Sequence, residues 1–411
     1  MSEYFTIAEV AKRLETTQKA VRRLVASKEL ASIKKGSSYT ISSDTLDEYI
    51  KSDRSKKEIT TNNPSYTPRN EDVELIDISK WWNDVPPSQM TYVDLFCGCG
   101  GLSKGLELSG MEGICGLDFF KEACMTYERN FSHPFINGDI KLPENKQAFY
   151  DTVKRQLNGR HLNVVAGGFP CQGFSMAGNR IVDDPRNSLY KELLEIVTNL
   201  QPDFVICENV KGLRSMLNGA VEAKIIEDFK EAGYEMRATV LCAADFYTPQ
   251  KRERVIFIGN RIGKRNYHPK PILPTNKYVT TGEAIGDLIN HLEDPDFNHV
   301  PTRHRPDMAQ RMLELEEGKS LYKGYSDAWK KCPWNEASCT IKENHGGVNI
   351  HPKLPRVLTA REMARLQSFP DDFIFMGPKN KQLVQIGNAV PPLLGKAIGL
   401  AVRYSFGELE K

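Results

Sequence analysis

The chain has 411 residues, of which 40% are hydrophobic, and its charges nearly balance, with 55 Lys and Arg against 53 Asp and Glu. This length allows two or three globular domains, and the composition is ordinary for a soluble protein. It contains no apolar run of the roughly 18 residues that cross a bilayer and no signal-peptide pattern, which predicts a cytoplasmic protein without a membrane partner. Nine cysteines without paired spacing predict free thiols and no metal site.

The first predicted unit, residues 1–53, has the order of elements of a winged helix-turn-helix domain. Thr6 and Glu9 form a capping box that opens a helix, and a second short helix follows after a turn. The stretch 31–41 alternates like a hairpin, and a last helix begins near Ser43. The run "TIAEVAKRLETTQKAVRRLVASKEL" with this basic wing resembles the excisionase-type winged helix domains of phage and plasmid proteins.

The charge of this first unit favours a nucleic-acid partner. Residues 1–57 contain 12 Lys or Arg and 8 Asp or Glu, a local excess that suits DNA phosphates. We therefore expect the unit to bind promoter DNA. The alternative is a small packing domain whose charges are only solvated.

A linker and an α/β domain are expected next. Residues 54–88 are polar, contain Pro and Asn, and lack apolar periodicity, which is typical of a linker. Within residues 89–267, strand-like runs alternate with helical stretches such as 187–200 and 220–232. This alternation predicts an α/β fold with a doubly wound sheet that has helices on both faces.

Three predicted strands of this domain end in residues suited to a nucleoside. The glycine-rich stretch "DLFCGCGGLS" (94–103) follows the first strand and opens a helix, which lets the backbone approach a ligand closely. Asp118 ends the next strand, where a carboxylate can bind a ribose diol, and Phe119 beside it can stack on a purine. Asp139 follows the third strand, where the adenine amino group would lie if the ligand runs across the strand tips. Taken singly, either acid is better explained as a helix or turn cap, and it is the ordered set of three strand ends that favours a nucleoside site.

Cys171 follows the fourth predicted strand, in the stretch "GGFPCQGFS" (167–175). A lone cysteine is often an inert buried thiol, and a nucleophile and a metal ligand are the other interpretations. The ligand-facing edge of the sheet and the surrounding Gly and Pro residues favour a functional loop.

Six ordered blocks of the sequence resemble those of the DNA (cytosine-5) methyltransferases. "GFPCQGFS" resembles the nucleophile motif of that family, and "DLFCGCGG" resembles its first S-adenosylmethionine motif. "ENV" (208–210) matches the catalytic-glutamate motif, "QKRERVIFIG" (250–259) the paired-arginine motif, and "RVLTAREMARLQSFPDDF" (356–373) and "QIGNAVPP" (385–392) two late motifs. The resemblance spans about residues 90–410 and implies a Rossmann-like methyltransferase sheet.

The resemblance implies four catalytic residues. Cys171 would add as a thiolate to C6 of a cytosine, which turns C5 into a nucleophile toward a methyl sulfonium. Glu208 would hold and protonate N3, and Arg254 would bind O2 of the ring. Arg252 would support the catalytic loop. Since a base in a duplex hides both faces of its ring, the cytosine has to be flipped out of the stack, and the loop 175–188, with Arg186, would close over it.

The cofactor implied by the resemblance is S-adenosyl-L-methionine, with S-adenosyl-L-homocysteine as product and no metal. The positions that correspond to cofactor contacts are Phe96, Cys99, Gly100, Gly101, Asp118, Phe119, Asp139, Ile140, Gly168, Leu189, Asn388 and Val390. Of these, Asn388 and Val390 would face the methionine end.

Residues 268–354 correspond to the variable target-recognition region of the family, and residues 355–411 carry the late motifs back to the catalytic domain. Within 268–350 there are 10 Lys or Arg against 12 Asp or Glu, so we expect a few placed DNA contacts in place of a basic stripe. Thr340 resembles the threonine that introduces the last part of this region. Candidate contacts are Arg303, Arg305, Lys342, Asn344 and His345.

The resemblance implies a bacterial single-chain enzyme that acts as a monomer on double-stranded DNA. A cognate restriction endonuclease for the same site is an expected partner, which places the enzyme in a restriction–modification system. Two alternatives stay open: a tRNA cytosine-5 methyltransferase, although the Cys-Phe-Thr insertion of the RNA enzyme is missing, and a non-catalytic DNA-binding regulator that retains the fold.

Overall fold

The structure, a computed structural model, describes residues 4–14, 21, 25, 30–35, 38–49, 73–170, 188–322, 329–342 and 348–409. The chain divides into two compact units near residue 67. Within the described ranges, every helix is too short or too polar to cross a membrane, and the eight cysteines among them are free thiols.

The N-terminal unit contains a small antiparallel sheet and a short capped helix. The sheet has the order β1-β3-β2. Its bounds and those of the helix are β1 Tyr4–Thr6, α1 Ile7–Arg13, β2 Ile33–Lys35 and β3 Ser38–Ser42. The predicted capping box is confirmed, since the Thr6 amide donates to Glu9 Oε2 over 2.7 Å and the Glu9 amide donates to Thr6 Oγ1 over 3.3 Å. The hairpin and the last helix, which includes residues 43–49, are also present. Most of the expected second helix lies outside the described residues.

A seven-stranded sheet forms the centre of the larger unit, with the order β10-β11-β9-β8-β5-β6-β7. The strands are β5 Thr91–Leu95, β6 Glu112–Asp118, β7 Phe135–Asn137, β8 Val164–Gly167, β9 Phe204–Val210, β10 Glu235–Cys242 and β11 Glu253–Asn260. Five of them, from β9 to β7, run parallel, and β11 is antiparallel to both of its neighbours. The strand order reverses beside β5, and this is where open α/β sheets bind ligands.

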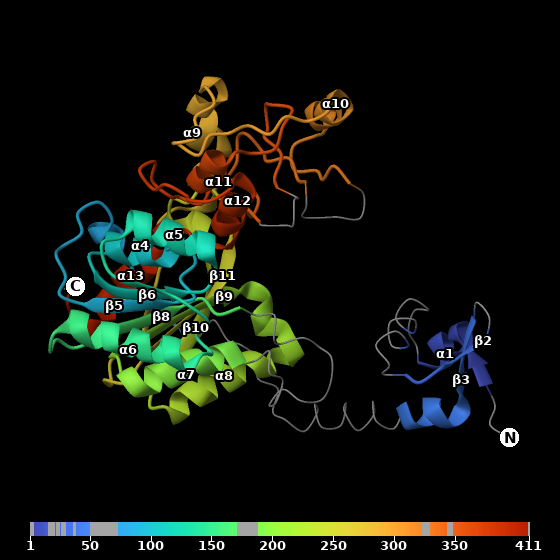
Figure 1. Ribbon diagram of the computed structural model, residues 1–411, viewed down its shortest axis with the longest axis horizontal. Helices are drawn as coiled ribbons and strands as arrows, with labels where there is room; N and C mark the ends of the chain where they lie inside the picture. Colours follow the sequence, from blue (N-terminus) through green and yellow to red (C-terminus); the bar gives the residue numbers. More distant parts are fainter. Residues whose placement is uncertain are drawn as a thin grey trace. The chain divides into compact units, whose positions relative to one another are not determined.

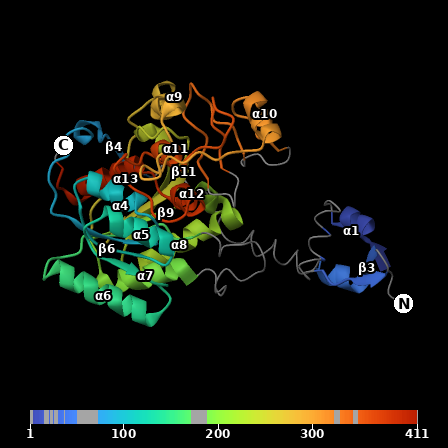
Figure 2. The same cartoon turned by 45° about the horizontal axis from the view of Figure 1, so that its top comes forward.

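Alternating side chains bury the two faces of this sheet in separate cores. On β8, Val165 joins one core, whereas Val164 and Ala166 join the other, because successive side chains of a strand point to opposite faces. Helices α6, α7 and α8 cover the first face, and α4 and α13 cover the second, which Figures 1 and 2 show. The helices of the two layers and α5 are α4 Gly101–Leu108, α5 Lys121–Asn130, α6 Pro143–Leu157, α7 Ser188–Leu200, α8 Ala220–Glu231 and α13 Pro392–Phe406. The predicted doubly wound α/β fold is confirmed.

The expected linker 54–88 ends earlier than its composition indicated. Strand β4 (Glu74–Ile76) pairs in parallel with β12 (Tyr267–Pro269), and a 3-10 helix follows at Ser79–Trp81. Ile78, Trp81 and Trp82 are buried in the core between the sheet and α13. The sequence of this segment predicts a linker because its few large apolar residues are spaced irregularly. The two tryptophans nevertheless bury a large apolar area.

A third core lies beyond the ends of the parallel strands. It combines residues from 285–350 with the first late motif and with residues next to the glycine-rich loop, among them Cys99 and Phe131. Its helices are α9 Thr281–Ile285, α10 Pro306–Glu314, α11 Ala360–Leu366 and α12 Lys379–Asn388, which lie above the sheet in the view of Figure 1. Residues 356–373 therefore pack with the expected target-recognition region, and the chain returns to the sheet with α13.

Helices α4 and α13 cross at unusually close range. A Cβ added to Gly105 of α4 would lie 2.4 Å from the Pro392 carbonyl oxygen and 2.5 Å from Gly395 Cα. One turn further along, a Cβ on Gly399 would lie 2.3 Å from Ser109 Oγ. Small residues at four-residue spacing on both helices thus allow the C-terminal helix to pack against the helix that follows the glycine-rich loop.

Candidate functional site

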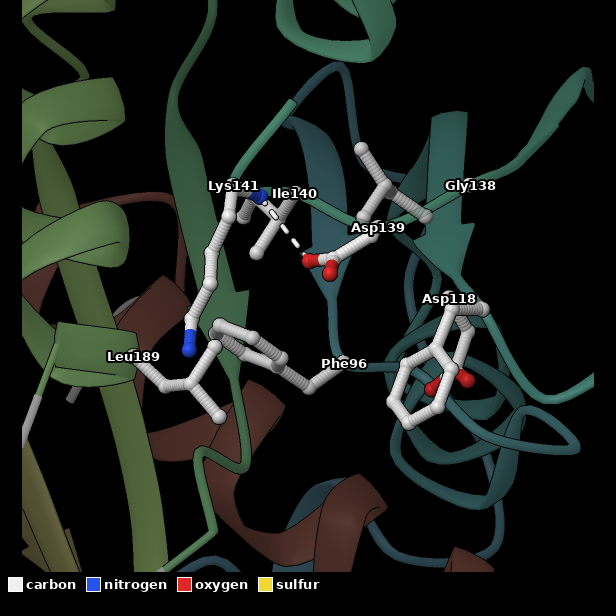
Figure 3. A pocket seen from close by; sticks show the side chains of 9 residues that line it. Phe96, Asp118, Gly138, Asp139, Ile140, Lys141 and Leu189 are labelled. Carbon is white, nitrogen blue, oxygen red and sulfur yellow. Dashed lines mark hydrogen bonds between the residues drawn. The ribbon is translucent and has the colours of Figure 1, made fainter. Parts of the chain in front are cut away.

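A pocket of about 140 Å³ lies at the carboxyl ends of β5, β6 and β7. Figure 3 shows residues of these strand ends together with Leu189 of α7 around the opening. The residues that line it are Phe96, Leu117, Asp118, Phe119, Gly138, Asp139, Ile140, Lys141 and Leu189. Six of the twelve positions expected to contact a cofactor therefore share one cavity.

The first two strand ends are locked together through Asp118. Its carboxylate accepts a hydrogen bond from the Gly98 amide and another from the Phe120 amide, both at 2.8 Å. Burial raises the pKa of Asp118, and the two amide bonds act in the opposite direction. Phe96 has a φ of 56°, a strained conformation for a residue with a side chain, and this turn directs the chain from β5 into the glycine-rich loop.

The remaining pocket residues differ in exposure. Phe119 is 68% exposed, which leaves its ring available to a ligand. Asp139 is exposed and accepts a hydrogen bond from the Lys141 amide at 3.0 Å, drawn as the dashed line in Figure 3. Lys141 was not predicted from the sequence, because a lysine after a strand-end turn reads as an ordinary solvated residue.

The other six expected cofactor positions lie outside the pocket lining. Cys99 is buried and its thiol hydrogen-bonds to the Gln385 carbonyl. Gly100 has a φ of 94° and packs against the Phe131 ring, and a Cβ on Gly101 would meet the Val390 carbonyl oxygen at 2.2 Å. Asn388 is exposed at the end of α12. Cys99, Gly101 and Val390 thus hold the glycine-rich loop against the returning C-terminal segment, and Gly168 lies beside Glu208.

Glu208 and Arg254 form an ion pair on neighbouring strands. Arg254 Nε lies 2.8 Å from Glu208 Oε1, and the two side chains are only 12–13% exposed. The antiparallel register of β9 and β11 pairs Glu208 with Ile256 and Arg254 with Val210. Both charged groups therefore project from the sheet near the end of β9, where the pairing keeps them together.

The segment that leads to Cys171 is anchored next to this ion pair. The Asn209 side chain donates to the Phe169 carbonyl at 2.9 Å, and a Cβ on Gly168 would lie 3.2 Å from Glu208 Oε2. Glycine at 168 thus leaves room for the carboxylate. Cys171 and Arg186 lie outside the described residues, so their expected roles remain predictions.

The buried Arg252 side chain links three segments of the chain through hydrogen bonds. Its guanidinium donates to the Ile341 carbonyl at 2.9 Å and to the Gly387 carbonyl at 3.1 Å. Burial lowers its pKa, to which the positive charge of Arg254 adds. Its Nε has no hydrogen-bond partner among the described residues. Arg252 therefore holds β11, the expected target-recognition region and the last late motif together.

A buried hydrogen-bond chain begins beneath the glycine-rich loop. Ser103 donates to Asp94 Oδ2 at 2.6 Å, Ser103 Oγ lies 2.9 Å from Tyr127 Oη, and Tyr127 Oη lies 2.8 Å from His133 Nε2. Burial raises the pKa of Asp94 to about 7, with the Ser103 hydrogen bond opposing this rise and the charge of Asp118 adding to it. Asp94 Oδ1 has no partner among the described residues.

This buried carboxyl predicts a pH-dependent stability. Between its unfolded pKa near 3.9 and its folded pKa of about 7, native Asp94 keeps a proton that the unfolded chain has released. The free energy of unfolding should therefore fall as pH rises through this window, by about 1.4 kcal/mol per pH unit. The difference in free energy of unfolding between Asp94→Asn and wild type, measured by urea unfolding, should therefore shift in favour of the variant by about 3 kcal/mol from pH 5 to pH 8. The exposed Asp139→Asn variant is the control, and a constant difference between wild type and Asp94→Asn would contradict the prediction.

The expected target-recognition contacts are partly described. Arg303 and Arg305 are exposed, and Lys342 lines a second cavity of about 270 Å³ with Lys251, Lys330, Cys339 and Thr340. Thr340 donates to the Lys251 carbonyl at 2.9 Å. Asn344 and His345 lie outside the described residues.

Most of the chain is similar to known proteins. The model of the C-5 cytosine-specific DNA methylases matches residues 90–403, and a helix-turn-helix domain model matches residues 4–54. The type II methyltransferase M1.HphI of Haemophilus parahaemolyticus is 38% identical over 328 residues, which cover 76% of this chain and 86% of that protein. M.NgoFVII of Neisseria gonorrhoeae, also a type II methyltransferase, is 36% identical over 324 residues, with 73% and 83% covered.

Solved structures share the fold. One, described as a DNA modification methyltransferase encoded within an E. coli prophage, is 26% identical and has a TM-score of 0.63, covering 77% of this chain and 99% of the other. The structure of Spodoptera frugiperda DNMT2 has 19% identity and a TM-score of 0.55, with 77% and 100% covered.

Proposed function

This chain belongs to the family of C-5 cytosine-specific DNA methylases and is a DNA cytosine-5 methyltransferase of the type II kind, and we propose how it works. It transfers a methyl group from S-adenosyl-L-methionine to C5 of a cytosine flipped out of a short specific site in duplex DNA, through a covalent adduct between Cys171 and C6. The resemblance of the motifs and the ion pair between Glu208 and Arg254 support this mechanism.

The pocket at the strand ends fits the nucleoside part of the cofactor. Each Asp118 oxygen accepts one backbone hydrogen bond and keeps a lone pair for a ribose hydroxyl. In this proposal Asp139 accepts a hydrogen bond from the adenine amino group, and the ring of Phe119 stacks on the base, which its exposure in the pocket lining supports. When bound, the cofactor supplies an electrophilic methyl group on a sulfonium.

The chemistry on the cytosine divides between three side chains. The Cys171 thiolate attacks C6 while Glu208 donates a proton to N3, so that the ring becomes an enamine whose C5 takes up the methyl group. Arg254 binds O2 and stabilises the electron-rich adduct. A water molecule then takes the C5 proton as the bond between C6 and the Cys171 sulfur breaks and the thiolate leaves. N3 returns its proton to Glu208, which regenerates the enzyme and leaves 5-methylcytosine.

The single observation that carries this proposal is the position of the Glu208 and Arg254 pair against Gly168, three residues before Cys171. Glu208 and Arg254 therefore lie beside the segment that leads from Gly168 to the Cys171 thiol. Without a substrate, Arg254 pairs with the Glu208 carboxylate, so Glu208 takes up a proton from solvent as the cytosine binds, before it protonates N3. A bound cytosine would exchange this contact for hydrogen bonds from both groups to the ring.

Trapping of the adduct tests the mechanism. We expect a duplex with 5-fluorocytosine at the target position to form a denaturation-resistant complex with the full chain in the presence of S-adenosyl-L-methionine, because fluorine at C5 blocks the elimination. Peptide mapping should place the linkage on Cys171, and Cys171→Ser should give no complex. A methylated product without any trapped adduct, or an adduct on another residue, would overturn the covalent mechanism.

The substrate test separates DNA from RNA. Bisulfite sequencing of DNA from cells that express the chain should reveal one methylated cytosine in a constant sequence context. Methylation of tRNA with duplex DNA left unmodified would favour the RNA alternative.

We further propose that the enzyme protects this site from a cognate endonuclease in the cytoplasm and that it acts as a monomer, while its helix-turn-helix unit binds promoter DNA. The type II relatives and the helix-turn-helix match support this setting.

A further inference from the structure

Two cysteines outside the proposed catalytic site are brought together by one short segment. The Cys332 amide donates to the Ile350 carbonyl at 3.0 Å, and the Asn349 side chain donates to the Cys339 sulfur at 3.0 Å. The two cysteines, seven positions apart in sequence, pack in the same core, and their thiols are close enough for each to shift the pKa of the other. Their proximity therefore comes from the tertiary structure.

The two thiols differ in access and in reactivity. Cys332 is fully buried, whereas Cys339 is partly exposed and lines the cavity of about 270 Å³ that also contains Lys251 and Lys330. The neighbouring Cys332 thiol lowers the pKa of Cys339, and the positive charge of Lys330 acts in the same direction. An accessible thiol with thiolate character beside a second thiol is the arrangement of a redox-sensitive pair.

The pair is connected to the proposed active site through the backbone. Ser338 exchanges backbone hydrogen bonds with Pro249 and Lys251, at 3.0 and 2.9 Å. Two residues after Cys339, the Ile341 carbonyl accepts the hydrogen bond from Arg252. A displacement of Cys339 would therefore act on the segment that precedes β11, to which its neighbours Ser338 and Ile341 are hydrogen-bonded.

We propose that Cys332 and Cys339 form a reversible oxidation site, which a peroxide converts to a disulfide that weakens DNA binding. The Cys339 thiolate attacks one peroxide oxygen, the O–O bond breaks, and the departing hydroxide takes up a proton to leave as water. The Cys332 sulfur then attacks the Cys339 sulfenic acid, the S–O bond breaks, and a second water carries away the Cys332 proton. Two thiols lose two electrons and two protons, and one peroxide becomes two waters.

The effect on DNA follows from the geometry of a disulfide. The two sulfur atoms would approach to about 2.05 Å, well inside the contact distance of two unbonded sulfur atoms. This contraction pulls Cys339 and the adjoining Thr340 away from the lysine-lined cavity. This part of the inference rests on the proposed function, because it takes DNA as the ligand of that surface.

Peptide mapping tests the oxidation directly. Tryptic cleavage after Lys331 and Lys342 releases both cysteines in one peptide, 332–342. After exposure of the folded full chain to hydrogen peroxide, this peptide should be lighter by two hydrogens and resist alkylation, and dithiothreitol should restore both properties. Free, alkylatable Cys332 and Cys339 under conditions that oxidise other cysteines, or a sulfinic acid on Cys339 without a disulfide, would overturn the proposal.

DNA binding is measured in a Cys171→Ser background, so that oxidation of the proposed nucleophile does not contribute. Peroxide should weaken binding of a duplex containing the methylated site by roughly tenfold, as expected for one or two lost contacts to phosphate. Adding Cys339→Ser should abolish the response. Cys242→Ser is the matched control, since Cys242 is also partly exposed but its pKa is raised by burial, and it should leave the response unchanged.

These readouts separate the two proposals. A disulfide in peptide 332–342 without any change in DNA binding would overturn the regulatory part of the inference. A reduced enzyme that methylates no DNA would overturn the proposed function but would leave the oxidation result standing.

Discussion

Exchange of Glu208 for glutamine is expected to lower the rate of methyl transfer by roughly 10²- to 10⁴-fold, the range over which positioned acids act. Glutamine keeps the shape and the hydrogen-bonding oxygen of the side chain but cannot give a proton to N3. It also loses the ion pair with Arg254, 2.8 Å away. Single-turnover transfer of a labelled methyl group to a duplex that contains the target site measures the chemical step.

The Glu208→Gln exchange should slow the methyl-transfer step without weakening cofactor binding. The Asp118 carboxylate belongs to a different strand end, so S-adenosyl-L-methionine should bind the Glu208→Gln variant with nearly unchanged affinity. The control is Glu253→Gln, which removes an exposed acid of β11 that pairs with Lys211 and should retain wild-type transfer. If the Glu208 variant kept a rate within a few-fold of wild type, proton donation by Glu208 would have to be abandoned.

Exchange of Gly105 for alanine is expected to reduce the free energy of unfolding by about 3 kcal/mol, the upper part of the range for an overpacked core. The new methyl group would lie within 2.6 Å of backbone atoms of Pro392 and Gly395. Backbone cannot rotate away as a side chain can, so α4 and α13 have to move apart. The better helix propensity of alanine, worth at most about 1 kcal/mol, offsets only part of this cost.

Urea unfolding followed by tryptophan fluorescence measures the effect, because Trp81 and Trp82 lie in the same core as α13. Gly212→Ala is the matched control, since a Cβ at Gly212 would meet no atom within 4 Å among the described residues, and its stability should be nearly unchanged. Equal stability of the Gly105 variant and wild type would mean that the two helices are not packed at this distance. Affinity for the cofactor should also decrease, because α4 begins at the glycine-rich loop.

Local sequence patterns were sufficient for much of the architecture. The alternation of strands and helices predicted the doubly wound sheet, and the capping box at Thr6 predicted the start of α1, because both depend on neighbouring residues only. Strand-end residues such as Asp118 and Asp139 could also be assigned to a common edge, since parallel strands bring their carboxyl ends together. Six of these cofactor positions line one pocket.

Contacts between distant segments could not be read from the sequence. The segment 73–88 has the composition of a linker, yet β4 pairs with β12, nearly two hundred residues later. Lys141, the raised pKa of Asp94 and the approach of Cys332 to Cys339 depend on burial and on neighbours that no local pattern specifies.

The sequence alone therefore determined the order of the elements and the chemical types of the residues at the strand ends. Only the tertiary structure decided that Arg254 pairs with Glu208, that Arg252 binds the carbonyls of Ile341 and Gly387, and that glycines bring α13 against α4. The physical reason is that periodicity and capping act over a few residues, whereas ion pairs, close helix contacts and shifted pKa values arise between segments that only packing brings together.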